Sequence, residues 1–526
     1  MTRENNRSDN LKFFGASFLG ISVINLLVYG PSLTFNFLVR SDDQAYIFRN
    51  PYLQNWSLDN LLAIFSHVHF DSYLPVTLAS FSLDYTFWQF DPFGYHLTQL
   101  VLHTVNVFLA LVLLMQIGVS RGATLAVALV YAVHPIQTES VVWISERKNL
   151  LSAFFIFSSF LFYIQHTRET SRFSKWLGVS WTLFVLGLLS KSVTVMLPLV
   201  FVLYDICLAR RGLRLMEKIP FFAGSLAVAA ATVVTQGAVE AIREYAGGSF
   251  TMSFLYTLRV YWDYLESLGF PFFLSPQYFY RAGDLHAWRS LLADALVPSL
   301  VLAGLWNIRK RPYFAFGVGW FVLWLLPVSN LVPIQTLRQD RYLYLPSLAI
   351  FSSVLIPVLS ARRMRQYAAF PLILTGLLVI LLGSQTGKYS TVFASSRAYW
   401  LHVAKAYPPW SQAQFEAGYQ CWLVKDEACS IRFYNRAIQA DPQNALALNN
   451  LGALMIDQGR YGEARTYVEK SLKADPGLAN AYRNLIIIAK KTGKDLDRIP
   501  EWQRKYEGIR ASVKKRDYRL GKFRFR

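Results

Sequence analysis

Charge is what this sequence has least of. Asp, Glu, Lys and Arg together make up 16% of its 526 residues, whereas soluble domains contain about 25%. Hydrophobic residues make up 53%, and in the first three quarters of the chain they form successive blocks without charges. Each block is close to the ~20 residues that a helix needs to cross the ~30 Å hydrocarbon core. The composition therefore argues against a wholly soluble protein and predicts a large membrane domain of helices.

Cysteine and the familiar motifs of soluble enzymes are also scarce. The chain has three cysteines, and no glycine-rich phosphate loop, HExxH zinc motif or Ser/His/Asp arrangement stands out. Cys207 lies in an apolar block, while Cys421 and Cys429 could pair if they face an oxidising compartment. No cleavable signal peptide is evident, because segment 11–30 is long for one and no A-x-A site follows it. We interpret that segment as the first span.

Eleven hydrophobic segments are expected to span the membrane. We expect them at 11–31, 95–117, 122–135, 149–166, 174–190, 193–209, 219–237, 291–308, 313–331, 343–361 and 367–387. An odd number of spans places the two ends of the membrane domain on opposite sides. Short basic clusters fall in alternate loops, so the positive-inside rule predicts a cytoplasmic N-terminus and an extracytoplasmic C-terminal part. These clusters are Arg210, Arg211, Arg214 and Lys218; Arg309, Lys310 and Arg311; and Arg362, Arg363 and Arg365.

The net charge of the chain is +20. Much of the positive charge lies in these loops, where the positive-inside rule explains it, so we expect no nucleic-acid partner.

Segment 250–272 is apolar enough to resemble a further span, but it contains Arg259, Asp263 and Glu266. Such charges are costly at the bilayer centre, and Arg259 and Asp263 have the i,i+4 spacing of a helical ion pair. We therefore predict an amphipathic helix that lies at the outer membrane interface, with its aromatic residues at headgroup level.

A repeat of 34 residues begins after the last hydrophobic block. Pro408, Pro442 and Pro476 have this spacing, as do Gly418 and Gly452. Segment 447–476 matches the tetratricopeptide pattern, with small residues where its two helices must approach closely. The fold class is therefore all-α: a polytopic membrane domain at 1–390, a tetratricopeptide-repeat solenoid at 391–510 and a basic tail at 511–526.

Two adjacent carboxylates follow the first span. Asp42 and Asp43 stand in a loop whose only basic residue is Arg49. A carboxylate pair just outside a membrane can act as a general base or hold a divalent cation, or it can simply be solvated. On a short helix the two side chains would point about 100° apart, so we expect them to have different roles. We favour Asp43 as the base.

Other polar side chains gather at the predicted ends of spans. Charged residues at a membrane boundary usually have partners or a function, although an ordinary polar loop is the alternative for segment 134–152. His67 and His69 with Asp71 would make a poor metal site, since no third strong ligand is evident. The remaining candidates are His134, Glu139, Glu146, Arg147 and Lys148 in segment 134–152; Lys191 at the junction of two spans; and Arg338, Arg341 and Tyr342 in LRQDRYLYL.

The order of these motifs along most of the chain resembles the transmembrane O-mannosyltransferases with tetratricopeptide repeats, the family that modifies cadherins. The resembling segments are SDDQAYIFRNP, YHLTQLVLHTVNVFLAL, YAVHPIQTESVVWISERKNLL, LLSKSVTVMLPLVFVLYD and QDRYLYLPS, followed by the repeats. The sequence SERK at 145–148 suggests a bacterial branch of this family. Two positions depart from the family pattern: Tyr73-Leu74-Pro75, and Asn149 where relatives tend to have Asp.

The resemblance implies a GT-C-like fold and a lipid-phosphate-sugar-dependent glycosyltransferase. It implies catalytic roles for Asp42, Asp43, Glu139 and Glu146, and donor-phosphate contacts for Lys191, Arg338 and Arg341. The donor would be a polyprenyl- or dolichyl-phosphate hexose, mannose above all, and the acceptor a Ser or Thr hydroxyl of an extracytoplasmic protein held by the repeats. Any cofactor is unknown, with a divalent cation as one option.

The resemblance also implies a location. We expect a bacterial inner membrane with periplasmic repeats, or the endoplasmic reticulum membrane in a eukaryote. Two other functions fit the sequence. A lipid-linked-sugar transporter should carry charges deep within its spans and inverted repeats. A membrane-anchored scaffold with a passive membrane domain should tolerate changes at Asp42 and Asp43.

Overall fold

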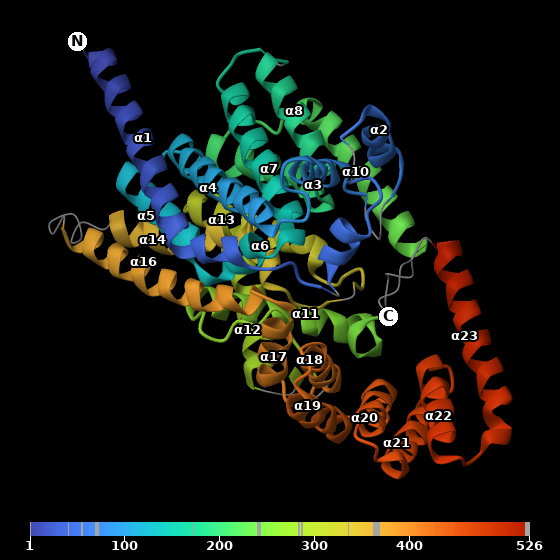
Figure 1. Ribbon diagram of the computed structural model, residues 1–526. Helices are drawn as coiled ribbons and strands as arrows, with labels where there is room; N and C mark the ends of the chain where they lie inside the picture. Colours follow the sequence, from blue (N-terminus) through green and yellow to red (C-terminus); the bar gives the residue numbers. More distant parts are fainter. Residues whose placement is uncertain are drawn as a thin grey trace. The chain divides into compact units, whose positions relative to one another are not determined.

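The computed structural model describes residues 2–39, 41–53, 56–68, 73–171, 173–238, 244–281, 284–285, 288–334, 336–360 and 369–520. The chain divides into two compact units, Met1–Ala394 and Ser395–Arg526. Within the described ranges both units are built from helices without a strand (Figure 1). The all-α class predicted from the sequence is confirmed. His69, Asp71, the cluster Arg362, Arg363 and Arg365, and the last six residues of the basic tail lie outside the described residues.

Fifteen α-helices make up most of the described part of the first unit. They are α1 (Thr2–Tyr29), α2 (Leu58–Ser66), α3 (Pro75–Trp88), α4 (Pro92–Gln116), α5 (Arg121–Val133), α6 (Thr138–Val142), α7 (Arg147–Thr167), α8 (Lys175–Leu188), α9 (Leu197–Tyr204), α10 (Leu215–Ala238), α11 (Phe250–Gly269), α12 (Trp288–Trp306), α13 (Pro312–Leu325), α14 (Pro346–Ser360) and α16 (Ala369–Ser390).

Seven helices in the described part of the chain are long and apolar enough to cross a membrane, or eight if the bent pair Arg121–Val133 and Pro135–Val142 counts as one span. This count of the described residues is lower than the expected eleven. Helix α8 has 14 residues, whereas a span needs about 17 or more. Helix α13 continues through a turn to Val328, and α14 reaches Ser360, the last described residue before 369. The expected sides of the two termini depended on the odd count, and they stay a prediction.

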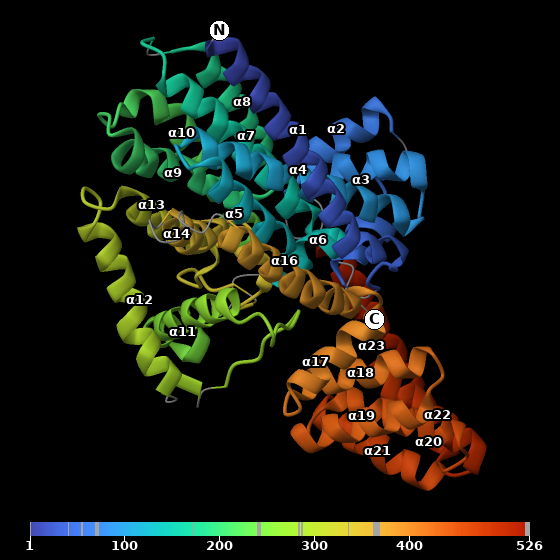
Figure 2. The same ribbon diagram turned by 90° about the vertical axis from the view of Figure 1, so that its left-hand side faces the viewer.

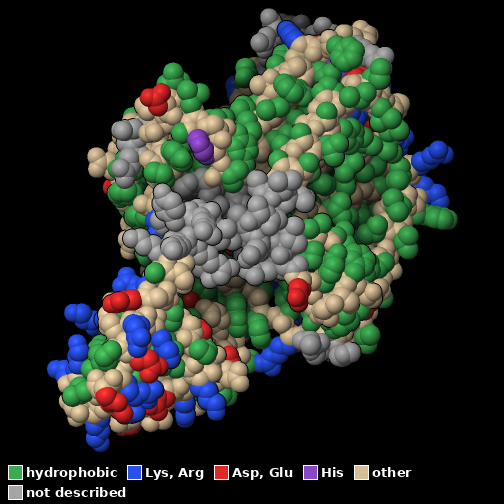
Figure 3. All heavy atoms as spheres, turned by 90° about the vertical axis from the view of Figure 1, so that its right-hand side faces the viewer, with side chains coloured by type: hydrophobic (Ala, Val, Ile, Leu, Met, Phe, Trp, Pro, Cys, Tyr) green, Lys and Arg blue, Asp and Glu red, His purple; other side chains and the backbone are tan. Residues whose placement is uncertain are grey.

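The surface of the first unit is apolar where these helices face outward. Leu27, Leu226 and Ile380 each expose at least 70% of their surface. Figure 3 shows hydrophobic side chains spread over large parts of the surface, and charged side chains gathered over the second unit. Contiguous apolar surface of this kind is rare on soluble proteins, and lipid is the environment that accommodates it.

Helices from distant parts of the chain pack around the segment that joins α5 to α7. Helix α1 lies beside α4, α5 and α16, and α4 packs along α7 (Figures 1 and 2). Between α5 and α7 the chain bends through the turns Pro135–Gln137 and Ile144–Glu146, and residues 135–146 are all buried. The polar segment singled out in the sequence therefore lies inside the helix bundle.

Helix α11 is the amphipathic segment expected at 250–272. Arg259 Nε lies 3.0 Å from Asp263 Oδ1, so the predicted i,i+4 ion pair is confirmed. The two charges lie on a buried face with Tyr264, while Phe254 on another face is exposed. The helix is not among the candidate spans of the described chain. Its location at a membrane interface stays a prediction.

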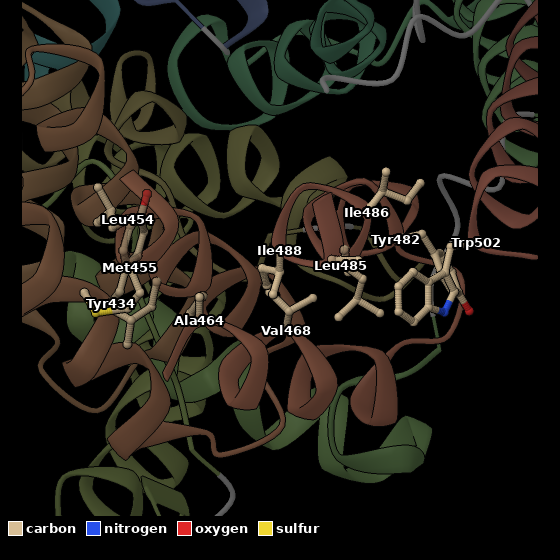
Figure 4. Close-up of a cluster of buried hydrophobic side chains, with 14 of the residues drawn as sticks. Tyr434, Leu454, Met455, Ala464, Val468, Tyr482, Leu485, Ile486, Ile488 and Trp502 are labelled. Carbon is tan, nitrogen blue, oxygen red and sulfur yellow. The ribbon is translucent and has the colours of Figure 1, made fainter. Parts of the chain in front are cut away.

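The second unit is a stack of helical hairpins. Its helices are α17 (Ser396–Ala406), α18 (Ser411–Leu423), α19 (Glu427–Ala440), α20 (Ala445–Asp457), α21 (Tyr461–Ala474), α22 (Ala479–Thr492) and α23 (Ile499–Leu520). Their facing sides share one hydrophobic core, part of which Figure 4 shows. A Cβ atom at Gly452 would lie 2.7 Å from a methyl group of Val468 and 3.2 Å from the carbonyl oxygen of Ala464. Glycine therefore lets α20 approach α21, as the repeat pattern requires.

Candidate functional site

Glu146, at the end of the turn before α7, lies among three cations. Its Oε1 atom is 3.3 Å from Lys148 Nζ and 3.4 Å from Arg341 Nε, and its Oε2 atom is 3.8 Å from Lys191 Nζ. The carboxylate is fully buried, whereas the three cationic side chains are 12–17% exposed. A buried carboxylate without partners would be strongly destabilising. The start of α7, the segment at Lys191 and the segment at Arg341 therefore meet at Glu146.

Arg341 is bound a second time by Glu139 of α6. Its backbone N–H donates to Glu139 Oε2 at 2.8 Å, and its guanidinium lies 2.6 Å from Glu139 Oε1. The guanidinium carbon is also 5.3 Å from the centre of the Trp143 ring and 5.4 Å from that of Tyr342. The fork of an arginine suits two carboxylates at once, so Glu139 and Glu146 together orient this side chain.

Asn149 links the carboxylate and the lysine of this group. Its Nδ2 atom donates to Glu146 Oε2 at 2.7 Å, and its Oδ1 atom accepts a hydrogen bond from Lys191 Nζ. A neutral amide can do both, because it carries a donor and an acceptor. The residues joined in this way form what we call the charge cluster: Asp42, Glu139, Glu146, Lys148, Asn149, Lys191 and Arg341.

Asp42 and Asp43 have different surroundings, as the sequence predicts. Asp42 Oδ2 lies 3.3 Å from Lys148 Nζ, and one third of the Asp42 side chain is exposed. Asp43 is 1% exposed and accepts hydrogen bonds from Leu38 N–H at 2.8 Å, and from Trp143 Nε1 and the backbone N–H of Ser145 at 3.0 Å each. The Ser145 hydroxyl donates to the same carboxylate.

Through these contacts Asp43 connects the first loop to the segment before α7. Burial raises the pKa of Asp43 to about 6, and the hydrogen bonds from Ser145 and Leu38 oppose this rise. Its oxygens are occupied by protein donors, whereas Asp42 belongs to the charge cluster and reaches solvent. The geometry favours Asp42 over Asp43 for contact with a substrate. The two carboxylates also face different partners, so they do not form one cation site between them.

A small cavity of about 30 Å³ opens beside the charge cluster. Of the described residues that line it, Lys191 and Arg341 are the charged ones, and no carboxylate is among them. Asn149 and Tyr342 contribute polar groups, and one wall is apolar: Val193, Trp324, Val328, Leu345 and Pro346. The cluster therefore presents cations to this cavity and keeps its carboxylates behind them, an arrangement that suits an anion.

Lys191, which faces the cavity, has a lowered pKa. It precedes the turn Ser192–Met196, outside the candidate spans. Burial lowers the pKa of Lys191 to about 8, although Glu146 acts in the opposite direction. A lysine held near this pKa remains mostly protonated at neutral pH and loses its charge in mildly alkaline solution.

Besides Asp43 and Tyr342, three further sequence candidates lie outside the charge cluster. Arg338 lies 3.5 Å from Asp263 and donates to the Ser267 hydroxyl at 2.6 Å, so α11 holds it. Arg147 pairs with Asp84 and donates to the Tyr95 carbonyl at 2.9 Å. His134 Nε2 lies 3.2 Å from the Leu268 carbonyl oxygen. Arg147 and His134 are buried and Arg338 is nearly so, and the polar contacts of all three support the packing of helices.

Two other groups contain residues of the kinds that bind metals. His67 Nδ1 lies 3.0 Å from the Ala63 carbonyl oxygen at the end of α2, and His69 and Asp71 fall outside the described residues. Cys421, Asp426 and Cys429 are close enough together to suggest ligands, but the two sulfurs form a disulfide with a Cα–Cα distance of 5.7 Å. A disulfide does not offer thiolates to a metal.

Sequence reasoning missed the partners of Asp43. In the sequence, Trp143 and Ser145 are only parts of a polar segment, although the tryptophan N–H and the serine hydroxyl fix the first loop. Asn149 stands out there as a departure from a family pattern, and nothing in the sequence indicates its bridging position. No local signal identifies such residues, because their partners are about 100 positions away in the sequence for Asp43 and 42 away for the Asn149–Lys191 contact.

Comparisons with known proteins match parts of the chain. A tetratricopeptide-repeat family model matches residues 433–466. Protein O-mannosyl-transferase TMTC3 of Mus musculus is 36% identical over 92 residues, 18% of this chain and 10% of the relative. Protein O-mannosyl-transferase Tmtc2 of Drosophila melanogaster is 32% identical over 140 residues, 26% of this chain and 15% of the relative. TMTC4 of Homo sapiens is 32% identical over 132 residues, 22% of this chain and 18% of the relative.

The matched regions thus cover less than a fifth of each of these relatives. All three relatives are animal proteins. The comparisons therefore do not support the bacterial branch that the sequence SERK suggested. The apolar helices and these homologues together identify an integral membrane protein. The chain is a partial homologue of the TMTC-type protein O-mannosyltransferases and carries a tetratricopeptide repeat, as its sequence predicts.

Proposed function

We propose that this chain is a membrane glycosyltransferase that moves a hexose, mannose above all, from a polyprenyl- or dolichyl-phosphate donor to Ser or Thr hydroxyls of an extracytoplasmic protein. The observation that carries the proposal is the cavity beside the charge cluster. Two cations face it, an apolar wall borders it, and a partly exposed carboxylate belongs to the same cluster. A lipid phosphate sugar needs these three features at one place.

Lys191 and Arg341 bind the donor phosphate in this mechanism. When the bond between the sugar carbon C1 and the phosphate oxygen breaks, that oxygen gains negative charge. Fixed cations stabilise this charge most when water is excluded and the cations are already oriented. Glu139, Glu146 and Asn149 supply the orientation through the contacts described above. Their role is to position the two cations.

Asp42 acts as the general base. The acceptor hydroxyl attacks C1 of the sugar, its proton passes to the Asp42 carboxylate, and the lipid phosphate leaves with the bonding electrons. A hydroxyl with a high pKa needs such a base in the transition state. Lys148 lies 3.3 Å from Asp42 and from Glu146, so it holds the Asp42 carboxylate in place until the acceptor arrives.

The repeats bind the acceptor protein and lie outside the cytoplasm. The disulfide between Cys421 and Cys429 supports this location, because disulfides persist in oxidising compartments. The absence of carboxylates among the described lining of the cavity also favours an anionic ligand over a cationic one.

The test is transfer by the purified full chain. The protein is incubated with polyprenyl-phosphate mannose and a Ser- and Thr-rich extracytoplasmic domain, and the hexose added to the acceptor is measured by mass spectrometry. Transfer that disappears in Asp42→Asn, with normal donor binding, supports the enzyme. A scaffold predicts no transfer by either protein, and a transporter predicts movement of the lipid sugar between leaflets without transfer. Either of these results would reject the proposal.

A further inference from the structure

A second, much larger cavity lies at the other end of α13. Its volume is about 680 Å³, within the range of about 300–1,000 Å³ that small-molecule pockets occupy. It lies where α13 and α14 run side by side (Figures 1 and 2), and α4 and α7 complete its wall. Most of the lining is apolar, including Leu113, Ile117, Phe160, Phe316, Trp320 and Ile356.

The charges of this cavity are of one sign. Lys310 and Arg311 are the charged residues in its described lining, and no Asp or Glu is among them. Both side chains are exposed, and neither forms an ion pair with a described residue. An apolar cavity with two free cations at its rim matches a molecule that has an anionic head and a hydrocarbon body.

The rim has the composition of a membrane interface. Trp306 is 78% exposed and Tyr313 is 51% exposed, and Lys310 Nζ lies 5.9 Å from the centre of the Trp306 ring. Tryptophan and tyrosine gather at the headgroup level of a bilayer. Lys310 and Arg311 therefore lie where phosphate groups of lipids are found, with the cavity extending towards the hydrocarbon core.

This cavity is separate from the proposed donor site. Lys310 and Arg311 precede α13, whereas Arg341 follows it, and the 14 residues of that helix span about 21 Å at 1.5 Å per residue. The two cavities have no lining residue in common. A lipid phosphate at Lys310 therefore lies far from Lys191 and Arg341, so one phosphate group does not occupy both sites.

We infer that this cavity binds an anionic phospholipid of the surrounding membrane, with its phosphate at Lys310 and Arg311 and an acyl chain between α13 and α14. The positive-inside rule, applied to Arg309, Lys310 and Arg311, places this rim in the cytoplasmic leaflet, where anionic lipids produce a negative surface potential. Tyr313 donates a hydrogen bond to the Ile117 carbonyl oxygen at 3.0 Å, so the rim joins α4 to α13. The lipid would strengthen this junction. The inference does not depend on the transferase activity.

The experiment uses the full chain in nanodiscs that contain equal amounts of phosphatidylglycerol and phosphatidylcholine, followed by native mass spectrometry of the lipids that stay bound. We expect the wild-type protein to retain phosphatidylglycerol. The double variant Lys310→Gln and Arg311→Gln should lose this preference by about thirtyfold, since each basic group near an anionic surface contributes about a factor of five. Arg309→Gln, the adjacent exposed arginine outside the lining, is the matched control and should retain it.

A second pair of variants tests the apolar part. Ser352→Trp on α14 would fill the cavity from its wall and should displace the lipid, whereas Val354→Trp, on an exposed position of the same helix, should not. Equal retention of both phospholipids by the wild-type protein overturns the inference. So does the recovery of a polyprenyl phosphate that Ser352→Trp displaces, because the cavity would then hold the tail of the donor.

Discussion

Lys148 holds its Nζ atom 3.3 Å from the Oδ2 atom of Asp42, and this ion pair connects the first loop to the start of α7. Through this ion pair, Asp42 has different surroundings from the adjacent Asp43. Asp42 faces the charge cluster and solvent, while Asp43 is enclosed by Leu38, Trp143 and Ser145. The proposed mechanism therefore takes Asp42 as the base because of the partners of the two carboxylates.

Asp42→Asn should reduce transfer by about 10²–10⁴-fold, the usual effect of removing a general base, with normal expression and donor binding. Asp43→Asn should act through stability, because a buried amide cannot accept from all the donors that now surround the carboxylate. The expected loss is about 1–3 kcal/mol. Rates and thermal unfolding of the two variants are measured side by side. An inactive Asp43→Asn protein of wild-type stability, beside an active Asp42→Asn protein, would restore Asp43 as the base.

Lys191→Gln should weaken binding of the donor, since one of the two cations that face the cavity is lost. A hydrogen bond to a charged group contributes about 1.5–3 kcal/mol, so the affinity for polyprenyl-phosphate mannose should fall roughly tenfold to hundredfold. Arg338→Gln is the matched control, because Arg338 binds Asp263 and Ser267 instead. Donor affinity is measured by quenching of tryptophan fluorescence. Equal losses in both variants would contradict the assignment of the phosphate site.

Donor binding should weaken as the pH rises through about 8, the pKa of Lys191. At pH 9 only about one tenth of a group with this pKa is protonated. The folded-state pKa lies below that of an unfolded lysine, so deprotonation of Lys191 favours the folded state. The loss of binding should therefore occur without unfolding. Lys191→Arg should extend binding to higher pH, because an arginine stays charged; a pH profile unaltered by this substitution would exclude Lys191 as the titrating group.

Asn149→Asp should also weaken donor binding, although it changes few atoms. A carboxylate at this position would lie close to Glu146, which now accepts from Asn149 Nδ2 at 2.7 Å, and it would compete with the donor phosphate for Lys191. We expect an affinity loss of about tenfold, from one added charge within the cluster. Asn106→Asp on α4, where Asn106 donates to the Leu150 carbonyl and Tyr344 hydroxyl, is a control for the general cost of a buried carboxylate. Tighter donor binding by Asn149→Asp would be the opposite of what the geometry implies.

Gly452→Ala should destabilise the repeat unit by about 1–3 kcal/mol, the usual effect of overpacking, because the added methyl group meets Val468 and the Ala464 carbonyl. Gly462→Ala in α21 has no atom within 4 Å of the new methyl group and should be neutral or stabilising. Hydrogen exchange of α20 and α21 amides in the full chain reports the local stability. Faster exchange in Gly462→Ala than in Gly452→Ala would contradict the packing argument.

Local patterns in the sequence determined the helices and the repeats. Apolar blocks predicted where helices such as α4 and α12 lie, since a helix in lipid satisfies its backbone polar groups within itself. The spacing of Arg259 and Asp263 predicted their ion pair, because residues four apart share a helix face. The repeat period predicted the close approach at Gly452. The span count was less secure, because block length in the sequence does not show where a helix such as α8 ends after 14 residues.

The tertiary structure alone decided which polar residues act together. Arg147 and Lys148 are adjacent, yet Arg147 pairs with Asp84 and Lys148 with Asp42 and Glu146, because neighbouring side chains on a helix diverge by about 100°. Lys191 and Arg341 are far apart in the sequence, and the packing of the helices brings both to Glu146. Sequence composition could identify charges that needed partners, but the choice of partner depends on which helix faces are brought together by packing of the whole unit.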